Sequence, residues 1–532
     1  MRRDAQLQQL LLLVASSLFF ASRSTLAAHS GGLHPVVLLP GYPCSQLEAR
    51  LTDEYQPPSA LLGCRERKGK GWFRLWEEDD PTMDPCSADQ LRLVYDPIAG
   101  DYRNVAGVET RVVGFGTTRG FGSRDPSNRH ICMGGLVAAL EGAGYTEGKN
   151  LFGAPYDFRY APAAPGKASA SFSNITSSLI RLVERASKMN GHKPVILVGH
   201  SMGSFTTLVF LNRAPRSWRD RYIKHFVMLG LGAGGNSIVL QLLNPDLSVP
   251  PANALAYANT TRSFVSLITL VPSPKVFDHT PLVITPGKNY SADDNAEYLA
   301  AVGFSDGEVA RYRTRVLPVI LGLTAPLVPL TCVNGVGLPT MERLVYMDGE
   351  SIQGGKPRVV YGDGDGIINL QTVLTLDKLI RDDPNQRYFK SILLPNVTHN
   401  GLVSDDSALK RVVSGCQFHS LDLPGAIIIN ALQNIDYVGF GCLRAHMQAD
   451  IDSSIWSATW HHLVNLDHIA KIFEDERSLC LGYEEQPYET KEFVVLTGVE
   501  VLGGDDREKD LRMERGKSKR YIFNNDEIKW VF

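Results

Sequence analysis

An apolar stretch that stops abruptly at a turn containing glycine and serine is the clearest pattern along the chain. Residues 194–198 (PVILV) are apolar and rich in β-branched side chains, which predicts a buried strand. The pentapeptide Gly199-His200-Ser201-Met202-Gly203 follows, and apolar residues then recur at roughly helical spacing over residues 205–211. A strand, a sharp turn and a helix in this order predict a nucleophile elbow, which holds the hydroxyl of Ser201 above the end of a sheet.

A sharp turn of this kind needs glycine on both sides of the serine. A Cβ atom at position 199 or 203 would clash with the neighbouring strand or helix. In a chain with 48 glycines, however, a G-x-S-x-G pentapeptide alone is weak evidence. The flanking strand and helix make the signal specific, so we expect an enzyme that transfers acyl groups through a serine.

Strand-like and helix-like segments alternate along most of the chain. This alternation predicts an α/β fold with a mostly parallel sheet, and the elbow specifies the α/β-hydrolase type. A segment rich in Pro, Asn and Leu, about residues 240–330, interrupts the pattern and predicts a cap insertion. Besides 194–198, the expected strands are residues 35–39, 345–347, 358–361 and 391–394, and the expected helices are 132–141 and 177–189.

Changes in composition divide the chain into three parts. Residues 1–28 have the character of a targeting segment, and residues 29–412 carry the α/β pattern. Residues 413–532 form a C-terminal extension without a motif that indicates a role. Within this extension, residues 453–473 have amphipathic helical spacing, and the charge run at 504–520 predicts a solvated or disordered segment.

The N-terminus has the layout of a secretory signal peptide. Arg2 and Arg3 precede an apolar run at residues 10–21, and small residues around Ala27 and Ala28 suit a cleavage site. The run is too short to span a bilayer, although an uncleaved signal anchor stays an alternative. No other segment approaches 18 consecutive apolar residues, so we expect a secretory-pathway protein without a transmembrane helix, located outside the cell, in the endoplasmic reticulum lumen or in the vacuole.

The composition agrees with this location and argues against nucleic acid as a partner. With 532 residues, 44% hydrophobic residues and a net charge of −3, the chain has an ample core and no electrostatic footprint for nucleic acid. No motif indicates a cofactor. Four N-x-S/T sequons predict glycosylation on a secretory route, and they lie at Asn174, Asn259, Asn289 and Asn396.

The cysteines favour disulfides over a metal site. None of the eight forms a C-x-x-C pair or stands near histidines at zinc-ligand spacing. In an oxidising compartment a few disulfides are expected, and Cys64 and Cys86, which bracket a short loop, are the favoured pair.

Two further residues complete a catalytic constellation with Ser201. A serine hydroxyl needs an imidazole to accept its proton and a carboxylate to orient that imidazole, in the chain order Ser, Asp or Glu, His. The predicted strand at 358–361 runs into Gly362-Asp363-Gly364-Asp365-Gly366, and the next strand ends in a loop with His399. We assign Asp365 as the acid, with Asp363 as the alternative, and His399 as the base. The glycine-rich loop lacks the ligand spacing of an EF-hand, so calcium is not expected.

The oxyanion of the tetrahedral intermediate needs two backbone N–H groups. One belongs to the residue after the nucleophile, Met202. The second is expected from the early Pro40-Gly41-Tyr42-Pro43 turn, where Tyr42 is favoured because a proline has no N–H to donate.

Several stretches of residues 34–412 resemble the lecithin:cholesterol acyltransferase family, and within it the plant group. The matches fall in family order, and the hexapeptide at 154–159 is far more specific than G-x-S-x-G. They are residues 37–41 (VLLPG), 46–49 (QLEA), 113–116 (VGFG), 154–159 (APYDFR), 199–203 (GHSMG), 335–340 (GVGLPT) and 364–366 (GDG).

The resemblance implies a function and assigns roles to residues. It implies Ser201 as nucleophile, Asp365 as acid and His399 as base, and it places Tyr42 at the oxyanion position. The loop between Cys64 and Cys86, within a lid at about residues 50–90, resembles the family's disulfide-closed lid. Trp72 and Trp76 fall where an aromatic side chain contacts the acyl chain or the lipid interface.

The implied reaction moves a fatty acyl chain from a phospholipid to a sterol, to another lipid hydroxyl or to water, at a lipid surface. Phospholipase A activity is the close alternative. A catalytically decayed lipid-binding protein is the alternative of another class, because residues 230–235 (GLGAGG) and Ile367 depart from the family pattern. Cys332 matches a family disulfide cysteine whose partner position here holds Thr375 or a neighbour, so it is either free or paired with a cysteine of the extension.

Overall fold

A computed structural model describes most of the first 420 residues and six short strands beyond them. The chain divides into two compact units, Met1–Ser420 and Leu421–Phe532. The predicted signal peptide, Asn259 and the predicted helix at 453–473 lie outside the described residues. The described ranges are 33–77, 84–121, 132–244, 260–347, 349–353, 355–386 and 388–420, followed by the strands of the second unit.

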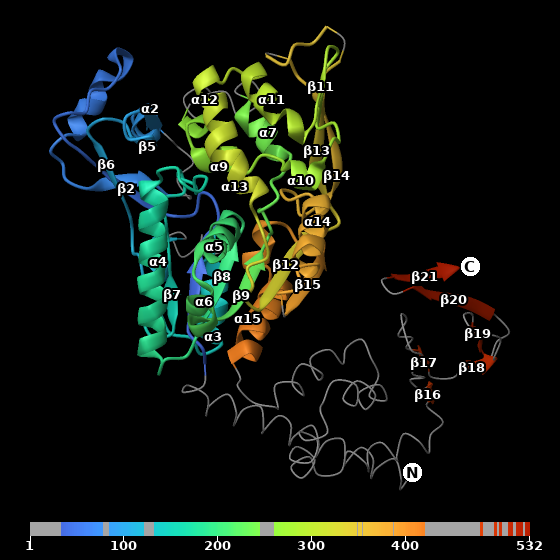
Figure 1. Ribbon diagram of the computed structural model, residues 1–532. Helices are drawn as coiled ribbons and strands as arrows, with labels where there is room; N and C mark the ends of the chain where they lie inside the picture. The colour runs from blue at the N-terminus through green and yellow to red at the C-terminus, as the bar shows by residue number, and fades with distance from the viewer. Residues whose placement is uncertain are drawn as a thin grey trace. The chain divides into compact units, whose positions relative to one another are not determined.

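The centre of the first unit is a six-stranded sheet whose strands all run parallel, in the order β15-β12-β9-β8-β1-β7 (Figure 1). β8 (Val195–His200) is buried along its whole length, which explains why its sequence is continuously apolar up to Val198. The other strands are β1 (Val36–Leu39), β7 (Leu151–Gly153), β9 (Ile223–Leu229), β12 (Leu330–Val336) and β15 (Phe389–Pro395).

Helices cover both faces of this sheet. Alternate residues of β1 belong to two different buried apolar clusters, Val37 and Leu39 to one and Val36 and Leu38 to the other. The first cluster includes side chains of α4 (Ala170–Met189), α5 (Met202–Arg213) and α14 (Leu370–Arg381), and α6 (Arg216–Tyr222) packs at its margin. The second includes α3 (Gly134–Gly142) and α15 (Asp406–Ser420). This is the α/β-hydrolase fold expected from the sequence.

The N-terminal part adds a small antiparallel module beside the sheet. β2 (Leu47–Leu51) pairs with both β3 (Phe73–Trp76) and β6 (Val108–Val112), and β4 (Leu93–Asp96) forms a hairpin with β5 (Asp101–Asn104). A disulfide between Cys64 and Cys86 joins η1 (Ser59–Arg67) to α2 (Pro85–Leu91), the pair favoured from the sequence. The short η2 (Thr118–Gly120) leads back toward the core.

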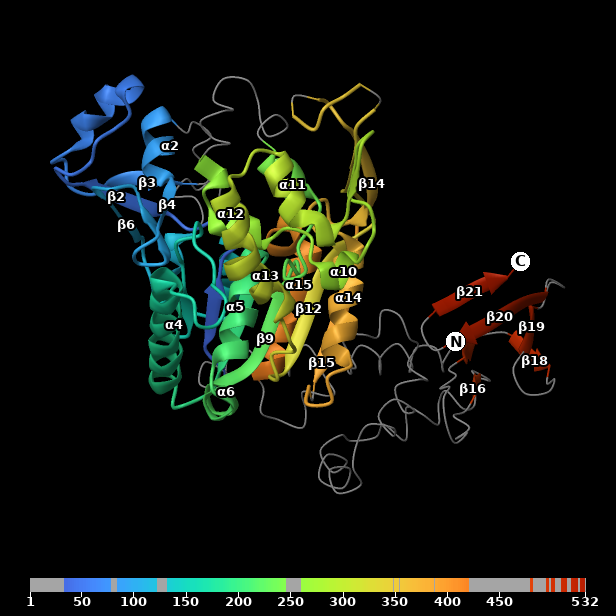
Figure 2. The ribbon, with the colours of Figure 1, turned by 45° about the horizontal axis from the view of Figure 1, so that its top comes forward.

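Residues 238–244 and 260–321 form a mostly helical insertion over the sheet (Figure 2). It contains a π-helical turn, η5 (Tyr312–Val316), between α12 (Asp306–Arg311) and α13 (Leu317–Leu321). The other elements are α7 (Ile238–Leu243), α9 (Val265–Thr269), α10 (Pro274–Phe277), β10 (Val283–Ile284), β11 (Asn289–Tyr290), η4 (Ala292–Asp294) and α11 (Asn295–Ala301).

Two strand predictions are corrected here. The strand expected at residues 345–347 is β13 (Leu338–Val345), which ends where the prediction begins. The strand expected at 358–361 is β14 (Arg358–Gly364), which continues through the glycines expected to form a loop. Both belong to a separate sheet, β11-β10-β13-β14, because β14 turns back antiparallel onto β13. The bounds of β13 and β14 depend on their pairing with each other, and this pairing cannot be read from the local sequence of either strand.

The second unit contains only short antiparallel pairings among its described residues. One sheet joins β16 (Leu479–Leu481) to β17 (Val494–Leu496). The other runs through β18 (Val499–Leu502), β19 (Lys509–Met513), β20 (Ser518–Asn524) and β21 (Glu527–Val531). The charge run at 504–520, expected to be solvated or disordered, therefore contains strand residues. Among the described parts of both units, no helix is long and apolar enough to cross a membrane.

Candidate active site

Ser201 stands at the junction of β8 and α5 in a backbone conformation that non-glycine residues rarely adopt, with φ 52° and ψ −120°. A Cβ on Gly199 would lie 2.8 Å from Cα of Ser204, and one on Gly203 would overlap the carbonyl oxygen of Leu39. The Ser201 N–H donates to the carbonyl of Leu229 at 2.8 Å. The strained turn is therefore held by close packing on both sides, as the glycine pattern predicted.

Asp365 and His399 meet in the structure although they come from different sheets. Asp365 directly follows β14, and His399 lies four residues beyond the end of β15. Nδ1 of His399 is 2.8 Å from Oδ2 of Asp365. The side chains of His399 and Asp365 are 8% and 1% exposed, so water competes little for this contact.

The carboxylate of Asp365 is fixed in its ionised form. Its Oδ1 accepts the N–H groups of Ile367 at 2.9 Å and Ile368 at 2.7 Å. Burial alone would raise the pKa of Asp365, but the neighbouring His399 and the two backbone N–H groups outweigh burial and lower it. An acceptor-only carboxylate beside Nδ1 directs the proton of His399 to that nitrogen and leaves Nε2 as a base.

Asp363, the alternative acid, faces elsewhere. It is exposed, and its Oδ1 accepts the N–H of Gly337 at 2.6 Å, which closes the turn between β12 and β13. Thr340 completes the support of the acid loop, since its hydroxyl accepts the N–H of Gly366 at 2.8 Å. The geometry thus favours Asp365 as the partner of His399.

The glycine-rich loop at residues 230–235 links the base to the nucleophile. Gly230 has φ +59°, and a Cβ there would lie 2.7 Å from Cε1 of His399. Gly232 faces Ser201, and its Cβ would lie 3.7 Å from the serine carbonyl carbon. Asn334 of β12 holds the loop by accepting the N–H of Leu231 at 2.9 Å. Ser201 and His399 therefore border the same loop.

The predicted oxyanion turn lies directly against the nucleophile. A Cβ on Gly41 would be 3.1 Å from Cβ of Ser201. The Tyr156 hydroxyl donates to the carbonyl of Pro40 at 2.9 Å, and the ring of Tyr42 packs edge-on against Phe158 at 5.3 Å between centroids. Met202 is the first residue of α5, where a backbone N–H has no intrahelical acceptor.

A second disulfide, which the sequence did not indicate, anchors the same turn. Cys44, two residues after Tyr42, is bonded to Cys132 at the start of the segment leading into α3. Cys332 forms no disulfide and is buried, which decides between the two alternatives for this residue. Long sequence separation explains why the Cys44–Cys132 pair gave no signal.

The two lid tryptophans are only half-buried and have different environments. Trp76 donates its indole N–H to the carbonyl of Pro43 at 2.8 Å and packs 5.7 Å from the ring of Phe158. The guanidinium groups of Arg50 and Arg111 lie over the ring of Trp72, at 5.2 and 4.3 Å from its centre. Trp76 thus ties the antiparallel module to the oxyanion turn.

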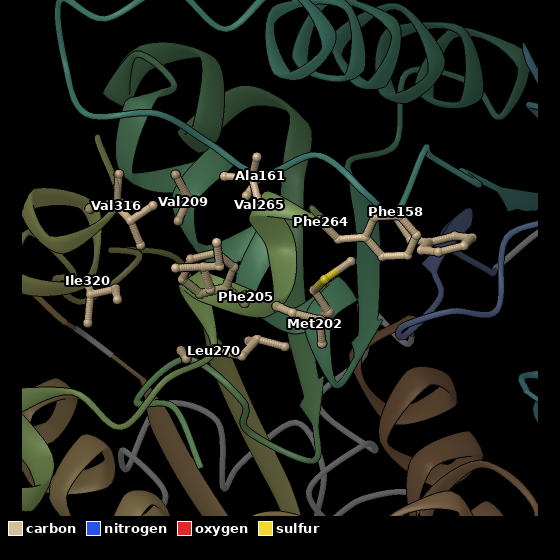
Figure 3. Packing of buried hydrophobic residues seen from close by; sticks show 14 of the residues in the cluster. Phe158, Ala161, Met202, Phe205, Val209, Phe264, Val265, Leu270, Val316 and Ile320 are labelled. Carbon is tan, nitrogen blue, oxygen red and sulfur yellow. The ribbon is translucent and has the colours of Figure 1, made fainter. Parts of the chain in front are cut away.

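Apolar side chains gather beside the elbow. Figure 3 shows Met202, Phe205 and Val209 of α5 packed among residues of the insertion and of the 154–161 segment. Because these side chains are buried together, they fix the position of α5 and of the elbow that precedes it. The insertion and segment residues of this group are Phe158, Ala161, Phe264, Val265, Leu270, Val316 and Ile320.

Other predicted positions lie at the surface. Asn174, Asn289 and Asn396 are exposed, as a glycan would require. Within the described ranges, Asp278, His279 and Asp293 bring three metal-ligating side chains together, but all three are exposed. This exposed cluster gives no reason to propose a bound metal there.

The comparisons with known proteins agree with this chemistry. A family model described as lecithin:cholesterol acyltransferase matches residues 71–312. "Lecithin-cholesterol acyltransferase-like 1" of Oryza sativa subsp. japonica is 42% identical over 415 residues, which cover 76% of this chain and 91% of that protein. "Lysosomal phospholipase A and acyltransferase" of Mus musculus is 35% identical, covering 70% and 88%. Human "phosphatidylcholine-sterol acyltransferase" is 31% identical, covering 64% and 75%.

Proposed function

The chain belongs to the lecithin:cholesterol acyltransferase family, and from this premise we propose that it is a lipid acyltransferase or phospholipase acting on phospholipid acyl esters through a serine acyl-enzyme. The observation that carries the proposal is the strained Ser201 elbow beside the buried Asp365–His399 pair. Membership alone gives the reaction class, and these three residues give the route.

In the first half-reaction the Ser201 oxygen attacks the carbonyl carbon of the acyl ester. Nε2 of His399 takes the serine proton, and Asp365 stabilises the resulting imidazolium. When the tetrahedral intermediate collapses, the ester bond to the glycerol oxygen breaks. His399 returns the proton to that oxygen, and a lysophospholipid leaves the acyl-enzyme.

The negative charge on the intermediate's oxygen needs preorganised donors. We assign this role to the N–H groups of Met202 and Tyr42, because Met202 directly follows Ser201 and Tyr42 directly follows Gly41, whose Cβ would lie 3.1 Å from Cβ of Ser201. The anchoring of that turn by Tyr156, Trp76 and Cys44 supports a fixed donor position.

In the second half-reaction an acceptor hydroxyl attacks the acyl-enzyme with His399 as base. A lipid alcohol such as a sterol yields an ester, and water yields a free fatty acid. The names of the relatives include both outcomes. Which acceptor prevails depends on how well the lid excludes water and orients the alcohol.

The proposal also covers the domain organisation of the chain and its location in the cell. Residues 29–412 form the acyltransferase domain, with a lid at about 50–90 whose Trp72 and Trp76 contact lipid and a cap at about 240–330. The two disulfides fit a secretory-pathway location. A signal peptide at 1–28 and glycans at the four sequons belong to the same proposal, and the extension from 413 has no assigned role.

The test is incubation of the purified protein with acyl-labelled phosphatidylcholine, with and without sterol, followed by lipid separation. Wild type should release labelled fatty acid or form labelled ester, and Ser201→Ala should do neither. A fluorophosphonate probe should label wild type only. Turnover retained by Ser201→Ala would overturn the route, whereas wild type without turnover or labelling would favour the lipid-binding alternative.

A further inference from the structure

His200, the residue between the elbow glycine and the nucleophile, is buried against the base. It is the last residue of β8, and 3% of it is exposed. A histidine at this position costs desolvation without belonging to the Ser201, Asp365 and His399 constellation. The contacts of its two ring nitrogens indicate a structural role beside the base.

One ring nitrogen of His200 reaches the main chain of His399. Nε2 lies 3.0 Å from the His399 carbonyl oxygen. A carbonyl oxygen can only accept, so Nε2 carries the proton and donates it. The two rings also pack against each other, with centroids 4.8 Å apart and planes 36° from parallel.

The other ring nitrogen faces the oxyanion turn. Nδ1 of His200 is buried and has no hydrogen-bond partner among the described residues. A Cβ on Gly41 would lie 3.0 Å from it. The imidazole thus fills the space between the turn before Tyr42 and the His399 loop. Burial first, and the nearby His399 second, lower the pKa of His200 to about 3, so the ring is neutral and adds no charge beside the base.

Both backbone polar groups of His399 are hydrogen-bonded. Its N–H donates to the carbonyl of Asp365 at 2.9 Å, and its carbonyl accepts from His200. Since His200 is covalently next to Ser201, the second bond couples the nucleophile's position to the base's position. The Asp365 contacts tie His399 to the loop after β14, whereas the His200 contact ties it to the end of β8.

We propose that His200 is a positioning residue, which sets the distance and plane of the His399 imidazole relative to Ser201 by donating to the His399 carbonyl and packing on its ring. The proposal rests on the proposed function of the site. Small misplacements of a catalytic base cost about 10²-fold in rate when the reacting atoms lose alignment. The cost falls on the chemical step and leaves lipid binding intact.

Two amide variants test the hydrogen bond. The amide nitrogen of His200→Gln occupies the position of Nε2, four bonds from Cα, whereas that of His200→Asn stops at the position of Nδ1. We expect His200→Asn to lower kcat about 10- to 100-fold with KM changed less than about twofold, and His200→Gln to stay within about fivefold of wild type. The rate of serine labelling by the fluorophosphonate should follow kcat.

His225→Asn is the matched control. His225 is also fully buried, and its Nε2 contacts the Thr331 hydroxyl at 2.9 Å near the opposite end of the sheet. This control should lower the unfolding temperature but leave kcat and labelling unchanged. Equal rates for His200→Gln and His200→Asn, whether both fast or both slow, would overturn the positioning role. Wild type that neither labels nor turns over would instead overturn the proposed function itself.

Discussion

Asp365 holds His399 at two points, through the main chain and through the side chain. The His399 N–H donates to the Asp365 carbonyl at 2.9 Å, while its Nδ1 lies 2.8 Å from Oδ2 of the same residue. The second carboxylate oxygen accepts from Ile367 and Ile368. Asp365 thus holds the main-chain N–H and the Nδ1 side of His399, while His200 contacts its carbonyl and ring from β8.

The first prediction separates the two acidic residues of the glycine-rich segment. Asp365→Asn keeps the shape of the side chain but removes its charge, so the imidazolium formed during attack is no longer stabilised. We expect kcat for phospholipid turnover to fall about 10³- to 10⁴-fold. Steady-state release of labelled acyl product measures the change.

Asp363→Asn is the control for this experiment. Its carboxylate accepts the Gly337 N–H, and the variant should keep kcat within about threefold because an amide oxygen can accept the same bond. A larger loss of kcat in Asp363→Asn than in Asp365→Asn would reverse the assignment of the acid.

The second prediction concerns the loop that departs from the family pattern. In Gly230→Ala the new methyl group would occupy space 2.7 Å from Cε1 of His399, and the backbone would be held at φ +59°. We expect kcat to fall about 10²-fold as the imidazole is displaced, with roughly 1 kcal/mol lost from the free energy of unfolding.

Gly232→Ala provides the comparison in the same loop. Its Cβ would sit 3.7 Å from Ser201 main-chain atoms, an ordinary contact distance. Activity near that of wild type is expected there. If both alanine variants lose activity equally, the loop acts through general rigidity rather than through its contact with the base.

Local patterns allowed the elbow to be predicted, and non-local pairing limited the rest. The apolar strand, the two glycines and the helix around Ser201 lie within about twenty residues, so each is visible in the sequence. The order of Asp365 and His399 behind strand ends was visible for the same reason. The sequence did not show that β14 belongs to a second sheet, because its antiparallel pairing with β13 is not evident from the residue types of either strand.

Contacts between distant segments account for what the sequence missed at the site. Cys44 and Cys132 are 88 residues apart, and 199 residues separate His200 from His399. No local motif at any of these four residues indicates which residue it contacts. The lipid contact proposed for Trp76 stays a prediction, and its bond to the Pro43 carbonyl is an additional, inward contact that the sequence did not indicate.

The third prediction follows from the lengths of the two disulfide-closed loops. The Cys44–Cys132 bond spans 88 residues and Cys64–Cys86 spans 22. Loop entropy gives about 4.6 kcal/mol for the longer loop and about 3.4 kcal/mol for the shorter. Cys44→Ala with Cys132→Ala should therefore lower the free energy of unfolding more than Cys64→Ala with Cys86→Ala, measured by denaturant titration.

The two disulfide variants should also differ in function. Loss of Cys44–Cys132 frees the turn that carries Tyr42, so kcat should fall even on a short-chain monomeric ester. Loss of Cys64–Cys86 loosens the lid, so it should affect micellar phospholipid more than the monomeric ester. An identical profile on both substrates would contradict separate roles.

The fourth prediction is a pH dependence of stability that originates outside the active site. Asp377 of α14 is buried, and burial raises its pKa despite opposition from the Ser391 hydroxyl and from Arg381. A carboxyl whose folded pKa exceeds its unfolded value near 3.9 favours folding only while protonated, so its ionisation lowers the stability of the native state as pH rises. The cost therefore begins near the unfolded value and grows as the pH rises toward the folded pKa.

Asp377→Asn removes the ionisation while keeping the size of the side chain. The variant should therefore unfold at a higher temperature than wild type at pH 7, and the difference should shrink as the pH is lowered toward the unfolded value near 3.9. Thermal unfolding followed by circular dichroism at pH 7, 6, 5 and 4 measures the difference. A gap that stays constant with pH, or a variant less stable at pH 7, would show that packing or the Ser391 contact, rather than the buried charge, governs this position.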